Sequence, residues 1–146
     1  MDQTKADFIS KKRIAVFGVS RSAQKFGNST YRELKQRGYD VVAIHPDLES
    51  IDGDPVFKSL DEFSPTPEGA VISVSPNYVP DILRDLAKHD IKHVWLQQGS
   101  ESPEASQVGK DLGLSMVEGG CILMYAEPVS SIHSVHRWIW KVLKKY

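Results

Sequence analysis

Short apolar runs of strand length alternate with longer stretches of helical length along most of the chain. The runs lack a regular apolar–polar alternation, which is typical of strands that helices cover on both faces of a parallel sheet. Strands joined by helices imply right-handed crossovers. The pattern therefore predicts a Rossmann-like α/β fold: a doubly wound, mostly parallel sheet of about five strands with helices on both faces. We expect strands at residues 13–18, 39–44, 69–74, 92–96 and, more weakly, 114–117, and helices at residues 29–37, 79–89 and 103–112.

Two segments depart from this alternation. Residues 47–68 are rich in Asp and Pro, and we expect a short edge strand near residues 55–57 and a helical turn at 60–63. The tail returns to a helical period, which predicts a C-terminal helix over about residues 131–145. Its tryptophans and histidines favour self-association as a homodimer, and plain packing on the sheet is the alternative. A length of 146 residues fits one domain, 1–146, with its core at about 10–125.

The charge balance excludes some classes of partner. The chain has 18 Lys and Arg against 19 Asp and Glu, a net charge of −1. Without a strong overall field, neither nucleic acid nor an anionic membrane is expected as a partner. The single cysteine suits a reducing compartment, since it cannot form an internal disulfide. No apolar run approaches the roughly 18 residues of a membrane span, and the first residues lack a signal peptide's apolar core. We therefore expect a cytoplasmic protein.

Ligands of such a sheet bind beyond the carboxyl ends of the strands, where the strand order reverses. The turn after the first expected strand keeps only the first glycine of the dinucleotide pattern G-x-G-x-x-G, because positions 20 and 23 are not glycine. The turn still offers backbone N–H groups, two hydroxyls and two cations, which suit a phosphate. An ordinary turn explains it equally well. The candidate residues are Gly18, Ser20, Arg21, Ser22 and Lys25.

The end of the second expected strand discriminates between nucleotides. An NAD-binding protein places Asp or Glu here to accept a hydrogen bond from the ribose, whereas this chain has His45 and Pro46. A strand-end carboxylate would repel an additional ribose phosphate, whereas imidazole and a nearby Arg or Lys would favour it. This favours NADP or coenzyme A (CoA) over NAD. A histidine that merely caps the strand is the alternative.

Loops after the third and fourth expected strands supply further candidates. Ser75 and Pro76 are consistent with a turn into a helix, either as a ligand contact or as a simple helix cap. Gln97 and Gln98 place two neutral amides where a polar ligand would pass, and a solvent-facing loop explains them about as well.

Eight short segments follow one another in the order found in a known protein family: IAVFGVSR (14–21), KFGN (25–28), GY (38–39), HP (45–46), IDG (51–53), SP (75–76), VWLQQG (94–99) and CILM (121–124). Together they resemble the small stand-alone CoA-binding proteins, whose domain resembles the N-terminal domain of the succinyl-CoA synthetase alpha subunit. The resemblance covers about residues 10–125 and implies a Rossmann-type fold with coenzyme A, or an acyl-CoA, as its small-molecule ligand.

The resemblance also implies roles for individual residues. It places Ser20, Arg21 and Ser22 along the phosphates of CoA, and it places Gln97 and Gln98 beside the ligand.

Three further assignments follow from the same resemblance. His45 and Pro46 occupy a loop where the family more often has Asn-Pro and where the synthetases bring in a lysine that this chain lacks. Ser75 and Pro76 match a Val-Pro or Pro-Pro pair. Cys121 lies beside the pocket, where its sulfur would approach the pantetheine arm unless it is packed as a small buried hydrophobe.

No catalytic arrangement is visible in the sequence. Cys121 has no histidine near it, and His133 and His136 lack a further ligand on their helix face for a metal site. The carboxylates are scattered, without a paired acid and base. We therefore predict non-catalytic binding of CoA or an acyl-CoA, as a carrier, sensor or store. The alternatives are an NADP- or NAD-binding reductase or redox sensor, and the CoA-binding half of a multi-subunit acyl-CoA ligase.

Overall fold

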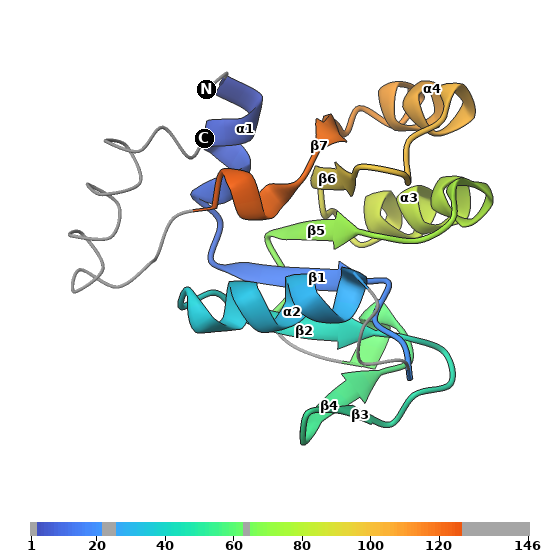
Figure 1. Ribbon diagram of the computed structural model, residues 1–146. Coiled ribbons are helices and arrows are strands. Elements are labelled where there is room, and N and C mark those ends of the chain that lie inside the picture. Colours follow the sequence, from blue (N-terminus) through green and yellow to red (C-terminus); the bar gives the residue numbers. More distant parts are fainter. Residues whose placement is uncertain (1–2, 22–25, 63–64, 127–146) are drawn as a thin grey trace, which may run out of the picture.

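The computed structural model describes residues 3–21, 26–62 and 65–126 (Figure 1). The expected C-terminal helix over about residues 131–145, with its surface for a homodimer, lies outside the described residues, as do Ser22 and Lys25. In the described part of the chain, no helix is long and apolar enough to cross a bilayer.

The described residues form one seven-stranded sheet and its covering helices. The strands are β1 (Arg13–Phe17), β2 (Asp40–Ile44), β3 (Ser50–Ile51), β4 (Asp54–Phe57), β5 (Gly69–Ile72), β6 (His93–Gln97) and β7 (Ser115–Gly120). The α-helices are α1 (Gln3–Ile9), α2 (Phe26–Gln36), α3 (Val79–Lys88) and α4 (Pro103–Asp111), and the 3₁₀ turns are η1 (Leu60–Glu62), η2 (Pro76–Tyr78) and η3 (Ile122–Met124).

The strand order is β3-β4-β2-β1-β5-β6-β7, with every neighbouring pair parallel except β3 and β4. In register, Ala15 of β1 lies between Val42 of β2 and Ala70 of β5. The chain leaves β1 through α2 to build one half of the sheet, and it then returns to β5 to build the other half (Figure 1). The order therefore reverses between β1 and β5, which confirms the predicted doubly wound α/β fold.

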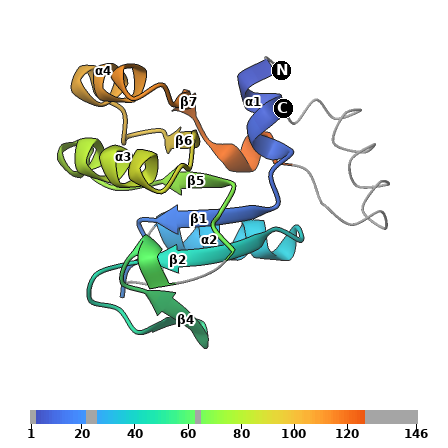
Figure 2. The same ribbon diagram turned by 180° about the vertical axis from the view of Figure 1, so that it is seen from behind.

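The strands are apolar on both faces because helices cover both. Ile14 and Val16 of β1 belong to the core under α1 and α2, whereas Ala15 and Phe17 belong to the core under α3 and α4. Figures 1 and 2 show α2 on one face of the sheet and α3 on the other. This two-sided burial is the reason that the strand sequences show no apolar–polar alternation.

The structure corrects the predicted number of strands and some boundaries. The strand expected near residues 55–57 is β4, but it is not the edge strand, because the unpredicted two-residue strand β3 pairs with it on the outside. β3 exists because Asp52 and Gly53, both with positive φ (51° and 86°), turn the chain back into a tight hairpin. Helix α1 was missed as well, and the last strand runs on to Gly120 instead of ending near residue 117. Its pairing with β6 shifts between Trp95 and Gln97, and this irregularity breaks the simple strand pattern.

Two glycines allow three backbone segments to meet at the carboxyl end of β1. Gly18 has φ +123°, and a Cβ built on it would lie 2.1 Å from the carbonyl oxygen of Ser73, which follows β5. A Cβ on Gly27, at the start of α2, would lie 2.2 Å from the carbonyl oxygen of Gly18. Both separations are shorter than real Cβ contacts, so any larger residue would push α2 or β5 away from β1.

This packing predicts the effect of adding one methyl group at residue 27. Alanine normally stabilises a helix relative to glycine by about 1 kcal/mol, but Gly27→Ala should instead destabilise the protein by about 1–3 kcal/mol through overpacking. Gly120→Ala is the matched control, since its Cβ would meet only Tyr125 at 3.6 Å. Urea unfolding of both variants measures the difference, and equal midpoints would contradict the close approach.

Candidate functional site

A cleft of about 710 Å³ opens where the strand order reverses. It is lined by residues 17–20 at the end of β1, by residues 73–75 after β5, and by residues 44–47 and 58–59 at the ends of β2 and β4. Helix α3 and the turn before it supply one wall. The volume lies in the range of small-molecule sites, and the position is where an open parallel sheet binds its ligands.

Five of the predicted site residues meet in this cleft: Gly18, Ser20, His45, Pro46 and Ser75. Arg21 is exposed directly after Ser20 but does not line it. Nor do Pro76, Gln97, Gln98 and Cys121, so a direct contact of these residues with a ligand stays a prediction.

Gln97 has a structural role in the fold. It is the fully buried last residue of β6, which rules out the solvent-facing loop considered for it, whereas Gln98 is exposed. Its side-chain oxygen Oε1 accepts a hydrogen bond from the Ile122 backbone N–H (2.8 Å), and its side-chain nitrogen Nε2 donates to the Thr30 hydroxyl (3.3 Å). The amide also lies 3.6 Å from the sulfur of Cys121. The side chain thus ties β6 to α2 and η3.

Two side chains that were not among the predicted site residues hold loops that line the cleft. The amide of Asn28 accepts from the Ser20 backbone N–H (2.7 Å) and donates to the Ser20 carbonyl oxygen (2.8 Å). The hydroxyl of Ser100 donates to the Val74 carbonyl oxygen (2.7 Å) and accepts from the Val74 N–H (3.0 Å). Asn28 and Ser100 are both buried residues. Each side chain takes the place of water as the hydrogen-bond partner of one backbone N–H and one backbone carbonyl.

The His45 ring closes the loop after β2. Its Nδ1 accepts from the backbone N–H groups of Asp47 (2.9 Å) and Leu48 (3.1 Å). Because an N–H can only donate, this nitrogen carries no proton, and the proton of the neutral ring sits on Nε2. His45 therefore caps the loop and still offers an Nε2–H donor to a ligand in the cleft.

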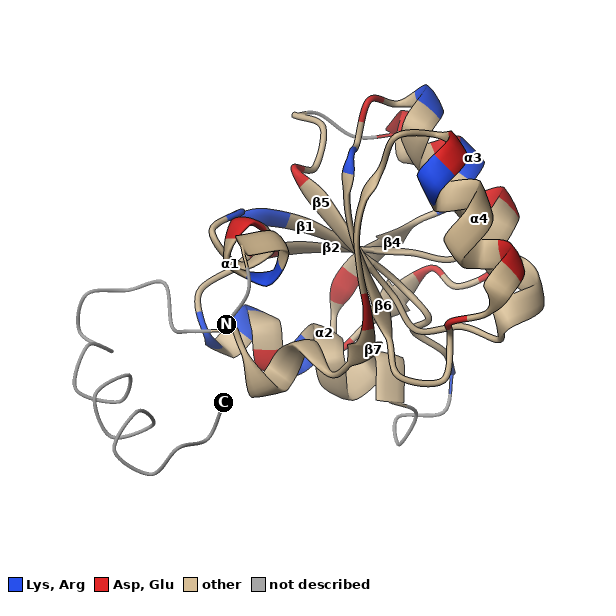
Figure 3. Ribbon diagram, turned by 90° about the horizontal axis from the view of Figure 1, so that it is seen from above, with Lys and Arg blue, Asp and Glu red and all other residues tan. Residues whose placement is uncertain are grey.

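Charged side chains of both signs line the cleft. His45 lies beside Lys58 at neighbouring strand ends, because the His45 N–H donates to the Phe57 carbonyl oxygen (2.9 Å). Within the described ranges, the Lys58 ammonium forms no ion pair. The carboxylates are Asp47, Asp81 and Asp85. Both signs also alternate along α2 and α3 (Figure 3).

His89 joins the end of α3 to η1, next to this cleft. Its Nδ1 lies 2.9 Å from the Asp85 carbonyl oxygen and its Nε2 lies 2.6 Å from the Asp61 carboxylate. Both ring nitrogens face acceptors, so only the doubly protonated ring satisfies both. Hydrogen bonds to the Asp85 carbonyl, and then to Asp61, accordingly raise the pKa of His89, and His89 lowers the pKa of Asp61.

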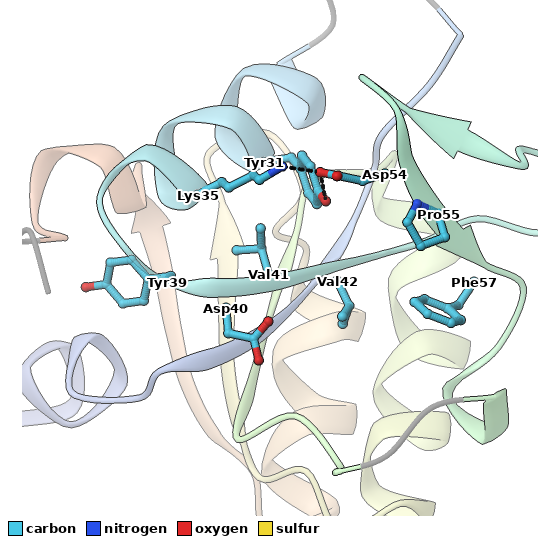
Figure 4. Close-up of a pocket in the computed structure, with 9 residues that line it drawn as sticks. All are labelled: Tyr31, Lys35, Tyr39, Asp40, Val41, Val42, Asp54, Pro55 and Phe57. Carbon is cyan, nitrogen blue, oxygen red and sulfur yellow. Dashed lines mark hydrogen bonds and ion pairs between the residues drawn. The ribbon is translucent and has the colours of Figure 1, made fainter.

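A second, smaller hollow of about 230 Å³ lies beside the β3–β4 hairpin (Figure 4). There Asp54 accepts from the buried Tyr31 hydroxyl (2.9 Å) and from the Lys35 ammonium (2.5 Å). Burial, with the Asp54 hydrogen bond, raises the pKa of the Tyr31 phenol. Arg32 and Asp52 form another ion pair (2.5 Å) between α2 and the hairpin. These contacts secure the edge of the sheet. Among the described residues, no cluster of three potential metal ligands occurs here or elsewhere.

Comparison with known proteins points to one family. A sequence profile for the family "CoA binding domain" matches residues 12–127. The chain is 24% identical over 111 residues to the uncharacterized protein YneT of Bacillus subtilis, covering 76% of this chain and 82% of YneT. It is also 24% identical over 123 residues to acetate–CoA ligase (ADP-forming) I of Archaeoglobus fulgidus, covering 77% of this chain but only 18% of the ligase. A hypothetical protein of Pyrococcus horikoshii has a similar structure, with a TM-score of 0.77, 25% identity and coverage of 84% and 87%.

The clamp on Ser20 predicts a measurable loss of stability. Asn28→Ala leaves the N–H and the carbonyl of Ser20 without their partner, which should lower the free energy of unfolding by about 1–3 kcal/mol. Ser29→Ala, one residue along the same helix, is the matched control and should change it by less than about 0.5 kcal/mol. Denaturant unfolding followed by circular dichroism tests this, and similar losses in the two variants would argue against the clamp.

The His89 bridge predicts a pH-dependent contribution to stability. Since its pKa is raised on folding, the contribution is fully present below the unfolded pKa of about 6.5 and is lost as pH rises through the folded pKa. The stability difference between wild type and His89→Gln should therefore shrink from pH 6 to pH 9. His93 provides a contrast: burial, and then Lys11, lower its pKa, so His93→Gln should show the opposite trend. Unfolding at several pH values measures both, and a constant difference for His89→Gln would contradict the bridge.

Proposed function

The chain belongs to the CoA binding domain family, and from that premise we propose that its cleft binds coenzyme A or an acyl-CoA without itself catalysing a reaction. The observation that carries the proposal is the cleft of about 710 Å³ at the reversal of strand order, with strand-end loops held by their own hydrogen bonds. Loops that are already ordered lose little entropy on binding. A cytoplasmic location and a homodimer stay predictions.

The first-strand loop supports a role in binding the diphosphate. Ser20 lines the cleft and contributes a hydroxyl, and the exposed cation of Arg21 follows it. The Ser20 backbone N–H is already bonded to Asn28. The Ser20 N–H is therefore not available to a phosphate, and the Ser20 hydroxyl and the Arg21 guanidinium are the described groups of this loop that we propose for the diphosphate.

The second-strand loop supports selection of a phosphorylated ribose. The Nε2–H of His45 and the ammonium of Lys58 come from adjacent strand ends, and both residues line the cleft. Lys58 compensates for the lysine of the synthetases that is absent from the loop after β2. A ligand with a ribose phosphate, CoA among them, can form charge-assisted hydrogen bonds with both donors, whereas the adenosine ribose of NAD carries no phosphate to accept them.

A role as one half of a multi-subunit acyl-CoA ligase is a second candidate. It is favoured by the similarity to acetate–CoA ligase (ADP-forming) I, of which the chain spans 18%. The non-catalytic proposal is supported, within the described residues, by the hydrogen bond of the Cys121 sulfur, whose partner 3.6 Å away is the neutral Gln97 amide, a group that cannot act as a base.

Native mass spectrometry of the purified protein, without and with added nucleotides, tests the ligand. The expected result is a complex with one CoA or acyl-CoA per chain. A complex formed with NADP but not with CoA would contradict the proposal. Affinity capture from a lysate then separates the two candidate roles, since a ligase half should co-purify stoichiometrically with its partner chain.

Loss of the ribose phosphate should weaken binding in a way that depends on Lys58. Each charged hydrogen bond lost should reduce affinity by about 10- to 150-fold, so calorimetry should show CoA binding more tightly than dephospho-CoA. In Lys58→Ala this preference should shrink. Lys110→Ala removes a cation of α4 away from the cleft and should leave the preference unchanged. An equal preference in wild type and Lys58→Ala would show that Lys58 does not contact the phosphate.

A further inference from the structure

One wall of the cleft carries an aromatic ring that the fold itself does not bury. The cleft-lining residues of α3 and of the turn before it follow one helical stripe, at positions 78, 81, 82 and 85. Tyr78 opens this stripe and is 62% exposed, whereas Trp95 and Phe8 are fully buried. In the described part of the chain, the side chain of Tyr78 makes no hydrogen bond and no ring contact.

The backbone that carries Tyr78 is nevertheless rigid. Pro76 begins η2 and Pro80 lies in the first turn of α3, so the φ angles on both sides of Tyr78 are restricted. The Tyr78 N–H donates to the Ser75 carbonyl oxygen (3.0 Å), and the next residue, Val79, is fully buried. An exposed ring on a fixed backbone is preorganised to receive a planar partner, because little further ordering is needed.

The charges on this wall restrict which part of a nucleotide can lie there. Asp81 and Asp85 line the cleft one helical turn apart, on the same stripe as Tyr78. Carboxylates repel phosphate, but they accept hydrogen bonds from amino and hydroxyl groups. The Lys58 ammonium and the Nε2–H donor of the neutral His45 ring come instead from the ends of β4 and β2. The uncharged part of the ligand is therefore favoured along α3.

We propose that Tyr78 is the stacking platform for the nucleotide base, and that the α3 stripe determines the orientation of the ligand in the cleft. The inference rests on the proposed binding of CoA and deepens it. The adenine ring lies against Tyr78 and beside Ile82, and its amino group faces the carboxylate side of the stripe. The phosphates lie towards Ser20, His45 and Lys58.

Calorimetry with fragments of the ligand tests this orientation. The probes are CoA, adenosine 3′,5′-bisphosphate (the base without the pantetheine arm) and 4′-phosphopantetheine (the arm without the base). Tyr78→Ala should weaken CoA and adenosine 3′,5′-bisphosphate by about 5- to 150-fold, the range of base stacking on an aromatic side chain. It should leave 4′-phosphopantetheine unchanged. Tyr78→Phe keeps the ring and should retain binding, and Met124→Ala, another exposed apolar residue outside the cleft, is the control.

A spectroscopic measurement separates stacking from a loss of structure. Proton NMR of bound adenosine 3′,5′-bisphosphate should show upfield ring-current shifts of the adenine H2 and H8 signals with wild type and Tyr78→Phe, and smaller shifts with Tyr78→Ala. If Tyr78→Ala weakens 4′-phosphopantetheine instead, the pantetheine arm lies on this wall and the inference is overturned. If wild type binds CoA and the variant binds it equally well, the platform is wrong while the proposed function stands. If wild type binds none of the probes, the proposed function itself fails.

Discussion

The backbone contact at Gly18 is the constraint on which the rest of the structure depends. Ser73 after β5 and Gly27 of α2 both approach Gly18 more closely than any side chain would permit. This contact brings α2 against β1 and places the loops after β1 and β5 together, so the cleft opens where the strand order reverses. Glycine at these positions serves packing between backbones. A chain that lacks the second and third glycines of the dinucleotide pattern can therefore still pack α2 and the loop after β5 against the end of β1.

The shape of the cleft depends on a few side chains that satisfy backbone groups in pairs. Asn28, Ser100 and His45 each make two hydrogen bonds to loop backbone, and each fixes the loop at the end of a different strand. Backbone N–H and C=O groups outside helices and strands need such partners, which here come from side chains. His89 makes a similar double contact, since its ring bonds the Asp85 carbonyl of α3 and the Asp61 carboxylate of η1. It thereby links the segment that follows Lys58 to the helix that lines the cleft. In the described parts of the strand-end loops, hydrogen bonds within the protein thus already hold Ser20, Val74, Asp47 and Leu48 in place.

Most of the fold could be predicted from local pattern, and the exceptions have physical causes. The five apolar runs became β1, β2, β5, β6 and β7, because burial on both faces leaves a continuous apolar signal. The pairing of β3 depends on a hairpin turn and on the ion pairs that tie Asp52 and Asp54 to α2. A strand of two residues is too short for its sequence pattern to predict either. Helix α1 is short and buries essentially one side chain, Phe8, against Trp95, so its signal is equally weak.

The sequence by itself determined the fold class, the edge of the sheet that binds ligands, and the residues that follow each strand, among them Gly18, Ser20 and His45. Applied to the strand expected at residues 55–57, the same rule would also have indicated Lys58. Only the tertiary structure decided that Gln97 points into the core, that Asn28 and Ser100 hold loops that line the cleft, and that Tyr78 stands exposed on the cleft wall. Those properties depend on contacts between residues that are distant in the sequence, such as Val74 and Ser100, which are 26 residues apart. The local sequence around a polar side chain does not indicate which distant backbone group it will bond.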